Sequence, residues 1–215
     1  MTNRAVSKDD VKAFADFCVR IRSFYQHFRI LFEFTDDDEK RLLHQTAPIF
    51  FGDLNLILIE HLILQICKVT DPETTFGNEN HTIEFFVSNA DFSATPAKLD
   101  RLIDLSKMIH EFRNKLKLAR DKIISHLDRN TMLDRKTLGA ATKKEWDEFW
   151  LNLQDFVFIM HDHFLAEPLA INDVAMLSDA DSLIKALRHA TYFDKLLRDA
   201  DPAVTKKCFE IAFRD

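Results

Sequence analysis

Apolar residues recur three and four positions apart through most of the chain, and this spacing predicts helices almost throughout. No segment shows the strict alternation of apolar and polar residues that is typical of a half-buried strand. Four long helices are expected at residues 7–34, 35–70, 96–126 and 143–164. Shorter helices are expected at residues 83–88, 179–198 and 203–213. The pattern therefore predicts an all-α fold, a bundle of four long helices followed by shorter C-terminal helices.

Capping residues support these boundaries. Ser7 is a suitable N-cap for the first helix, and the acidic run 36–39 suits the positive N-terminal end of the second. The second helix is expected to continue through a kink near Pro48 and to end at the dipeptide 71–72, Asp-Pro. Thr142 and Glu145 have the spacing of a capping box, which predicts the start of the fourth long helix.

The most apolar part of the chain is residues 54–66, where apolar side chains would surround the helix. We expect it to be the central core helix rather than a membrane span, because five polar residues interrupt the longer stretch 49–69: Asp53, Asn55, Glu60, His61 and Lys68. The first ten residues also lack the apolar core of a secretory signal. These features predict a cytoplasmic protein without a membrane partner.

Length and composition narrow the possible functions. The chain has 215 residues and 47% hydrophobic content, which suits one domain over residues 1–215. It contains only three glycines, so glycine-rich phosphate-binding loops are absent. Its three cysteines are widely separated among apolar residues, which favours buried thiols over disulfides or a zinc site. No cofactor or metal is expected.

Charge is unevenly distributed along an acidic chain of net charge −6. Residues 101–144 contain twelve Lys or Arg against five Asp or Glu, an excess of seven positive charges. Such a segment can attract nucleic acid, but it can equally be a solvated helix face beside a polar loop. If it binds RNA, the expected contact residues are Arg113, Lys117, Lys122 and Arg129.

One group of residues in this segment suggests chemistry. Metal-free RNA cleavage needs a base for the ribose 2′-OH proton and an acid for the leaving 5′ oxygen, and His126 can serve in either role. Charge accumulates on the phosphoryl oxygens in the transition state, and the planar guanidinium of Arg120 can stabilise it. Asp121 and Asp128 are the supporting candidates, because either could orient the imidazole or the guanidinium.

Helix geometry limits this hypothesis. Six residues of an ideal helix rotate a side chain by a net ~120° and advance it by ~9 Å, so Arg120 and His126 need not touch. They could converge at a frayed helix end, or a second chain could complete the site. A twofold homodimer would also supply the second histidine that two proton transfers require. Apolar residues on both sides of the central and third long helices fit such a dimer.

At these residues the sequence resembles the HEPN superfamily, whose motif is an Arg, four to six intervening residues and a His, usually with Asn, Asp or His just after the Arg. Arg120, Asp121 and His126 match it. The dipeptide 127–128 and the segment 62–72 (LILQICKVTDP) are most similar to the abortive-infection, AbiU-type branch. The resemblance covers about residues 40–165, leaving a C-terminal helical extension at about 166–215.

This resemblance implies a dimeric helical bundle with metal-independent endoribonuclease activity in active members, and a role in phage defence or a toxin–antitoxin system. An antitoxin or regulatory protein is then a possible partner. Some HEPN-like domains bind RNA, nucleotides or proteins without cutting, so a non-catalytic binding module is the alternative. A purely structural helical protein is the third possibility, in which His126 is a core or interface histidine and Arg120 forms a surface ion pair.

A metal site at residues 161–163 (His-Asp-His) is the weaker alternative. Positions i and i+2 diverge by ~200° on a helix, so the two histidines would not face one ion.

Overall fold

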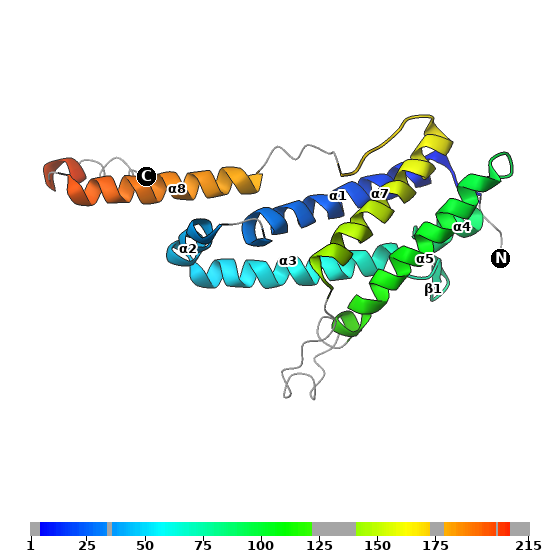
Figure 1. Ribbon diagram of the computed structural model, residues 1–215, viewed down its shortest axis with the longest axis horizontal. Coiled ribbons are helices and arrows are strands. Elements are labelled where there is room, and N and C mark those ends of the chain that lie inside the picture. Colours follow the sequence, from blue (N-terminus) through cyan, green and yellow to red (C-terminus); the bar gives the residue numbers. More distant parts are fainter. Residues whose placement is uncertain (1–4, 34–35, 122–140, 173–178, 201, 207–215) are drawn as a thin grey trace. The chain divides into compact units, whose positions relative to one another are not determined.

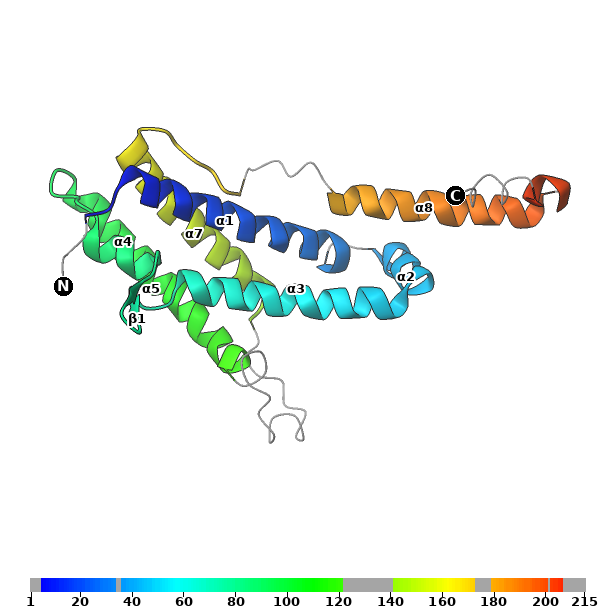
Figure 2. The same ribbon diagram turned by 180° about the vertical axis from the view of Figure 1, so that it is seen from behind.

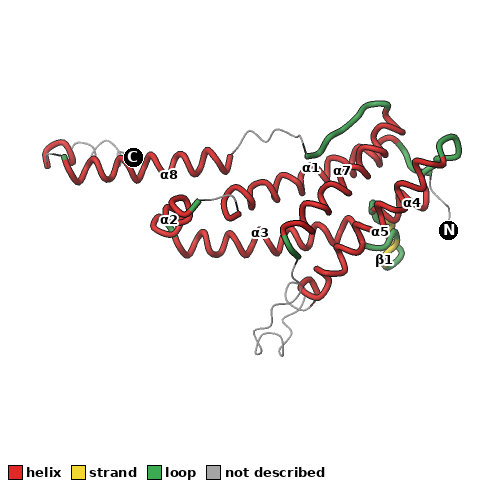
Figure 3. The backbone as a smooth tube through the Cα atoms, viewed as in Figure 1, coloured by secondary structure: helices red, strands yellow, loops and turns green. Residues whose placement is uncertain are grey.

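A computed structural model describes residues 5–33, 36–121, 141–172, 179–200 and 202–206 (Figure 1). Helices account for nearly all of the described structure, which confirms the all-α prediction (Figure 3). The chain divides into two compact units: Met1–Gln26 with Leu56–Ala175, and His27–Asn55 with Met176–Asp215. We call these unit 1 and unit 2 and describe each by itself.

Unit 1 contains most of the long helices. It includes α1 (Lys8–Phe28) as far as Gln26 and α3 (Pro48–Val69) from Leu56 onward. A hairpin of β1 (Thr74–Thr75) and β2 (Asn78–Glu79) follows α3. The remaining elements are α4 (Ile83–Asn89), α5 (Pro96–Ala119) and α7 (Lys143–Leu165). Helices α5 and α7 pack side by side, and α4 packs against α5 (Figures 1 and 2). The predicted short helix near residues 83–88 and the fourth long helix are confirmed.

Aromatic side chains fill the core of unit 1. Tyr25 of α1 stacks on Trp150 of α7 with ring centroids 5.0 Å apart. Phe112 of α5 stacks on Phe149 of α7 at 4.7 Å, and all four of these residues are buried. Phe14 contacts Phe86 of α4 at 4.8 Å. The helical spacing of the phenylalanines thus reflects core packing.

Capping interactions fix the starts of two helices. Ser7 Oγ accepts a hydrogen bond from the Asp10 backbone at 3.1 Å, and the Asp10 carboxylate accepts one from the Ser7 backbone at 2.9 Å. The capping box of Thr142 and Glu145 is also present. Both predicted helix starts are confirmed.

The predicted helix over residues 35–70 is in fact two helices, α2 (Asp37–Thr46) and α3. Ala47 separates them with φ −157° and ψ 75°. The physical reason is Pro48, whose ring excludes the preceding residue from the helical region, so the chain breaks instead of kinking. The first helix likewise ends early, at Phe28, and the π-helix η1 (Arg29–Glu33) follows it.

The sequence pattern gave no sign of the hairpin, which is a second correction. Thr74 pairs with Glu79 and Thr75 with Asn78 in antiparallel register. Phe76 and Gly77 form the turn with φ of 51° and 83°, the positive values that tight two-residue hairpins require. Two residues per strand are too few to produce a recognisable alternation.

Unit 2 is built from η1, α2, the first part of α3 and α8 (Asp179–Asp199). Its buried cluster is small and consists of Leu31, Leu42, Ala180 and Ile184. An ion pair between Glu39 of α2 and Arg188 of α8, with Oε1 and Nη2 2.6 Å apart, joins the two helices. The predicted helix at 179–198 is confirmed. Of the helix expected at 203–213, the structure describes residues as far as 206, and residues 202–206 are helical.

Helix α3 is only partly the core helix that its composition predicts. In unit 1, Leu62 and Ile66 are 1% and 0% exposed, whereas Leu56 and Ile57 are each 60% exposed. Within the described residues, α3 is the one helix long and apolar enough to cross a membrane, a test that the core helix of a soluble protein also passes. One side of α3 is therefore packed, and the other presents apolar side chains.

The packing of α7 leads to a stability prediction. Leu153 is fully buried and Leu151, two residues away, is 61% exposed. We expect Leu153→Ala to lower the free energy of unfolding by about 2 to 5 kcal/mol, because it leaves a cavity. Leu151→Ala should change it by less than about 0.5 kcal/mol. Urea unfolding followed by circular dichroism measures both, and equal effects would contradict the packing described here.

Candidate functional site

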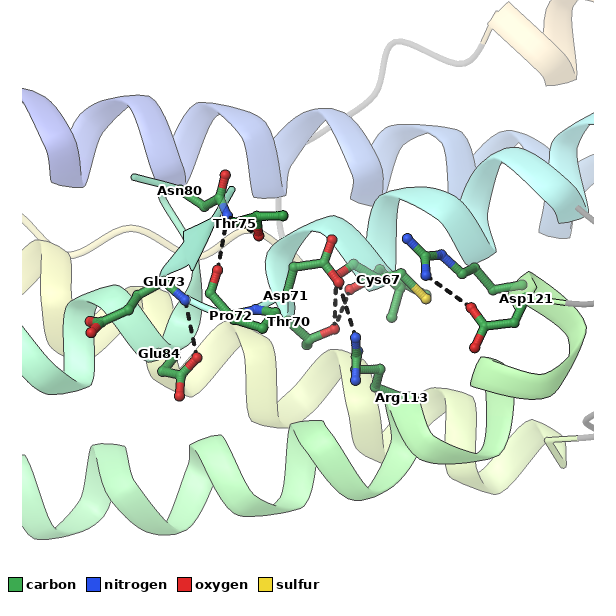
Figure 4. A network of polar contacts seen from close by, with 12 residues as sticks. Cys67, Thr70, Asp71, Pro72, Glu73, Thr75, Asn80, Glu84, Arg113 and Asp121 are labelled. Carbon is green, nitrogen blue, oxygen red and sulfur yellow. Dashed lines mark hydrogen bonds and ion pairs between the residues drawn. The ribbon is translucent and has the colours of Figure 1, made fainter. Parts of the chain in front are cut away.

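The C-terminal end of α3 lies against α5, and an ion pair joins them. The carboxylate Oδ1 of Asp71, just after α3, is 3.0 Å from Nη2 of Arg113 in the second half of α5 (Figure 4). The two side chains are only 26% and 16% exposed, so solvent screens this pair less than a surface pair. This contact positions the end of α3 beside the second half of α5.

The end of α3 is defined by its own hydrogen bonds. The buried Thr70 hydroxyl donates to the carbonyl oxygens of Ile66 and Cys67, at 2.8 Å and 3.1 Å. These bonds satisfy carbonyl groups that the last turn of a helix leaves without partners. Pro72 then prevents the helix from continuing, and Asp71 is held at its end.

At the end of α5 the helix widens into a π-turn at Arg120 and Asp121. Nη1 of Arg120 donates to Oδ1 of Asp121 at 2.9 Å, and about a third of each side chain is exposed. This hydrogen bond raises the pKa of Arg120. Arg120 itself keeps helical dihedrals of φ −57° and ψ −51°. Turns of the π type are frequent at functional sites.

The four charged groups all influence one buried thiol, that of Cys67. Burial raises the pKa of Cys67, while the positive charges of Arg113 and Arg120 lower it and the carboxylates of Asp71 and Asp121 raise it. Asp71 also contributes to the raised pKa of Arg120. We call these five residues the Arg–Asp cluster, and its two positive and two negative charges balance.

The predicted site residues fall into three groups. Arg120 and Asp121 lie together in the cluster. Asp121, one of the two carboxylates predicted to support the site, contacts the Arg120 guanidinium. Arg113 points at Asp71, and Lys117 is exposed on α5. The remaining candidates lie outside the described residues: His126, Asp128, Lys122 and Arg129.

Two members of the cluster were not predicted as site residues. Asp71 was interpreted only as the end of a helix, and Cys67 only as a buried thiol. Their i, i+4 spacing would have placed them on one helix face, and both lie in the segment 62–72 that carries the family resemblance. The sequence did not indicate that this face would meet Arg113.

Among the described residues, no group of three or more His, Cys, Asp or Glu side chains could hold a metal ion. The His-Asp-His stretch at 161–163 shows why. His163 Nε2 lies 2.9 Å from the Asp91 carbonyl oxygen, Asp162 pairs with Lys98, and His161 Nδ1 contacts the Glu167 carbonyl oxygen. The three side chains therefore have separate partners.

Comparison with known families agrees with this geometry. The family model described as AbiU2, of the HEPN type, matches residues 8–182. The chain belongs to the AbiU2 family of HEPN domains. The AbiU2 match confirms the resemblance seen in the sequence and extends it to the first helix and into α8, beyond the expected range of 40–165. This AbiU2 protein is thus a HEPN-type abortive-infection module.

No curated protein and no solved structure matches the chain.

The ion pair of the cluster can be tested by a double-mutant cycle. Asp71→Asn should lower the free energy of unfolding by about 1 to 3 kcal/mol, because a charged hydrogen bond to a partly buried guanidinium is lost. Combined with Arg113→Met, the loss should differ from the sum of the single losses by more than about 0.5 kcal/mol.

The pair of Asp104 and Lys107 on α5 is the matched control, with side chains 62% and 67% exposed. Its cycle should give a coupling near zero, because solvent screens it. An equally weak coupling between Asp71 and Arg113 would contradict the proposed link between α3 and α5.

Proposed function

We propose that this AbiU2 protein is a metal-independent endoribonuclease that acts in the cytoplasm in phage defence or as a toxin. The observation that carries the proposal is the position of Arg120, at the π-turn that ends α5, with its guanidinium held by Asp121. It is the first residue of the Arg–His motif in a chain that belongs to a HEPN family. An arginine fixed in this way is oriented before substrate arrives, and such preorganisation is what transition-state stabilisation requires.

Arg120 would stabilise the phosphoryl group. Its Nη1 donates to Asp121, and its Nε is buried without a hydrogen-bond partner among the described residues. With about a third of the side chain exposed, a phosphate would approach the exposed Nη groups. Asp121 would keep the plane of the guanidinium fixed while the negative charge grows on the phosphoryl oxygens.

His126 would transfer the protons. As base it takes the proton of the ribose 2′-OH, and the resulting oxygen attacks the adjacent phosphorus. The bond from phosphorus to the 5′ oxygen then breaks, and a second histidine, protonated, gives its proton to that oxygen. The products are a 2′,3′-cyclic phosphate and a 5′-hydroxyl. A homodimer that brings two copies of the motif together would supply both histidines.

RNA would follow the basic side chains around this site. Lys117 is exposed on α5, one turn before Arg120, and has no ion-pair partner in the described part of the chain. Lys122 and Arg129 would extend the contact toward His126. The role of Arg113 differs from the expected one, because its guanidinium is already bound to Asp71 and so positions the cluster.

One observation favours the alternative, a non-catalytic module that binds RNA, nucleotide or a protein partner such as an antitoxin. Both arginines of the cluster already have carboxylate partners within the chain. An arginine neutralised in this way attracts a phosphate less strongly than a free one. Cleavage assays separate the two functions.

The catalytic roles can be tested with three variants. His126→Ala should reduce single-turnover RNA cleavage by about 10² to 10⁴, the usual share of acid–base catalysis. Arg120→Lys should also slow cleavage sharply with little loss of RNA affinity, because lysine keeps the charge but loses the planar donor geometry. Lys117→Ala is the control, and it should mainly weaken RNA binding in a salt-dependent manner.

Chelators should not affect the parent activity, and the products should end in 2′,3′-cyclic phosphate. A parent protein that cuts no RNA, or a His126→Ala variant as active as the parent, would leave only the binding module. A requirement for added Mg²⁺ would contradict the assigned roles.

Dimerisation gives a separate prediction. Leu56 and Ile57 present an apolar surface on α3, and we expect a second copy to cover it. Sedimentation should show a dimer at micromolar concentration, and Leu56→Asp should shift it toward monomer. Phe76→Asp, at the fully exposed tip of the hairpin, is the matched control and should leave the dimer intact. A parent that sediments only as monomer would exclude the dimeric site.

A further inference from the structure

Unit 1 has a second feature close to the Arg–Asp cluster, a hollow of about 510 Å³. Its walls come from three places: Phe17 and Arg20 of α1, Lys68 and Asp71 at the end of α3, and Glu79 and Asn80 at the end of the hairpin. Its size falls within the range of small-molecule sites, which is about 300 to 1,000 Å³. Asp71 belongs to both the hollow and the cluster, so the two are neighbours.

One side of the hollow is cationic and aromatic. Arg20 and Lys68 are exposed, and neither has a carboxylate partner in the described part of the chain. The Arg20 guanidinium lies over the Phe17 ring, 5.6 Å from its centroid. The negative charge of Asp71 is balanced by Arg113, so it offsets these cations only in part. This side therefore offers a phosphate two positive charges beside a flat apolar surface.

The hairpin side offers hydrogen-bond acceptors. The Asn80 side-chain NH₂ group donates to the Pro72 carbonyl oxygen and to Thr75 Oγ1, both at 2.9 Å (Figure 4). Both amide hydrogens are thereby used, and Oδ1 is left to accept. The carboxylate of Glu79 is also an acceptor. A ligand with two neighbouring N–H donors could form hydrogen bonds to these acceptors.

The rim of the hollow is held in place by a hydrogen bond. His81 Nε2 lies 2.7 Å from Oδ1 of Asp10, which is 6% exposed. Burial raises the pKa of Asp10, but hydrogen bonds from Ser7 and His81 lower it by more than burial raises it. The resulting pKa is below the ordinary value of an aspartate. Asp10 is therefore a carboxylate that fixes the His81 ring, and with it the start of α4, against α1.

We propose that this hollow binds a guanine nucleotide. Its phosphate would contact Lys68 and the Arg20 guanidinium, and its base would pack against Phe17 beside that guanidinium, with N1–H and the N2 amino group donating to Glu79 and Asn80. Guanine is the base that presents two adjacent donors on one edge, which suits a wall of acceptors. Stacking on an aromatic ring is a general means of holding an unpaired base.

The source of the nucleotide is a guanosine of the RNA substrate, and this part of the inference rests on the proposed function. The hollow shares Asp71 with the cluster, so a guanosine bound there would place a nearby phosphate beside Arg113 and Arg120. The hollow would then select which RNA segment reaches the cleavage site.

Binding to the full chain tests this inference with two kinds of probe. The first is free GMP, with AMP for comparison, measured by calorimetry. The second is a short single-stranded RNA carrying 2′-O-methyl groups, which cannot be cleaved, with either one G or an A in its place. We expect the G-containing RNA to bind at least several-fold more tightly than its A-containing counterpart.

Two variants in the hollow and one outside it complete the test. Arg20→Ala should weaken binding of the G-containing RNA about tenfold, because a charge-assisted contact is lost. Glu79→Gln should remove most of the preference for G over A. Lys12→Ala, an exposed cation of α1 that does not line the hollow, should leave both unchanged. Both hollow residues are exposed, and circular dichroism would verify the fold.

The outcomes separate this inference from the cleavage proposal. RNA binding that neither Arg20→Ala nor Glu79→Gln alters would overturn the hollow as a nucleotide site, even if the parent cleaves RNA. Tight GMP binding without any preference among RNAs would overturn RNA as the source and assign the hollow to a free nucleotide. G-dependent RNA binding by a protein that does not cleave would support the hollow and refute the endoribonuclease.

Discussion

The ion pair of Asp71 and Arg113 joins segments 42 residues apart and determines where both candidate sites lie. It is short, at 3.0 Å, and largely shielded from solvent, so it can hold the end of α3 against α5. On one side of it are Cys67, Arg120 and Asp121. On the other is the hollow beside α1 and the hairpin. Loss of this pair would loosen both sites together.

Local sequence signals predicted most of the helices but not how they end or pack. Apolar periodicity located α5, α7 and α8, and a capping box also located the start of α7, because these signals act within a few residues. The break at Ala47 was missed because Pro48 can either kink a helix or begin one, and the periodicity continues across it. The exposed side of α3 was missed because an all-round apolar helix does not reveal which side lacks a neighbour.

The candidate site was predictable only where its contacts are local. Arg120 and Asp121 are adjacent, so the sequence could name Asp121 as a candidate partner of the guanidinium, and the structure shows the contact. Asp71 joins the cluster through tertiary packing, which periodicity does not encode, and it was interpreted as a helix terminator. The one signal of its ion pair with Arg113 is that the segment 62–72 accompanies the Arg–His motif in the family resemblance.

The positive charge of the segment 101–144 is weaker in the folded protein than in the sequence. Six of its basic residues in the described part have carboxylate partners, and four of those partners lie outside the segment. Glu148 is one turn from Lys144 on α7, whereas Asp71, Glu145 and Asp155 come from other elements than their partners. The packing of α3 and α7 against α5 brings these carboxylates to the segment. Folding therefore neutralises part of the positive charge that is counted along the sequence. Lys115 gives an example, since its hydrogen bond, together with those from Thr142, lowers the pKa of Glu145 to about 2.

The consequence is that net charge along the sequence is a poor guide to where this protein would hold a phosphate. Among the described residues, Lys117 on α5 has no carboxylate partner, and Arg20 and Lys68 have none either, in segments that the sequence pattern did not single out. An anion is attracted by charges that the fold leaves without partners, and these three cations lie near the Arg–Asp cluster. RNA recognition would then depend on the hollow and on Lys117, and Arg120 would be free to act at the phosphate that is cleaved.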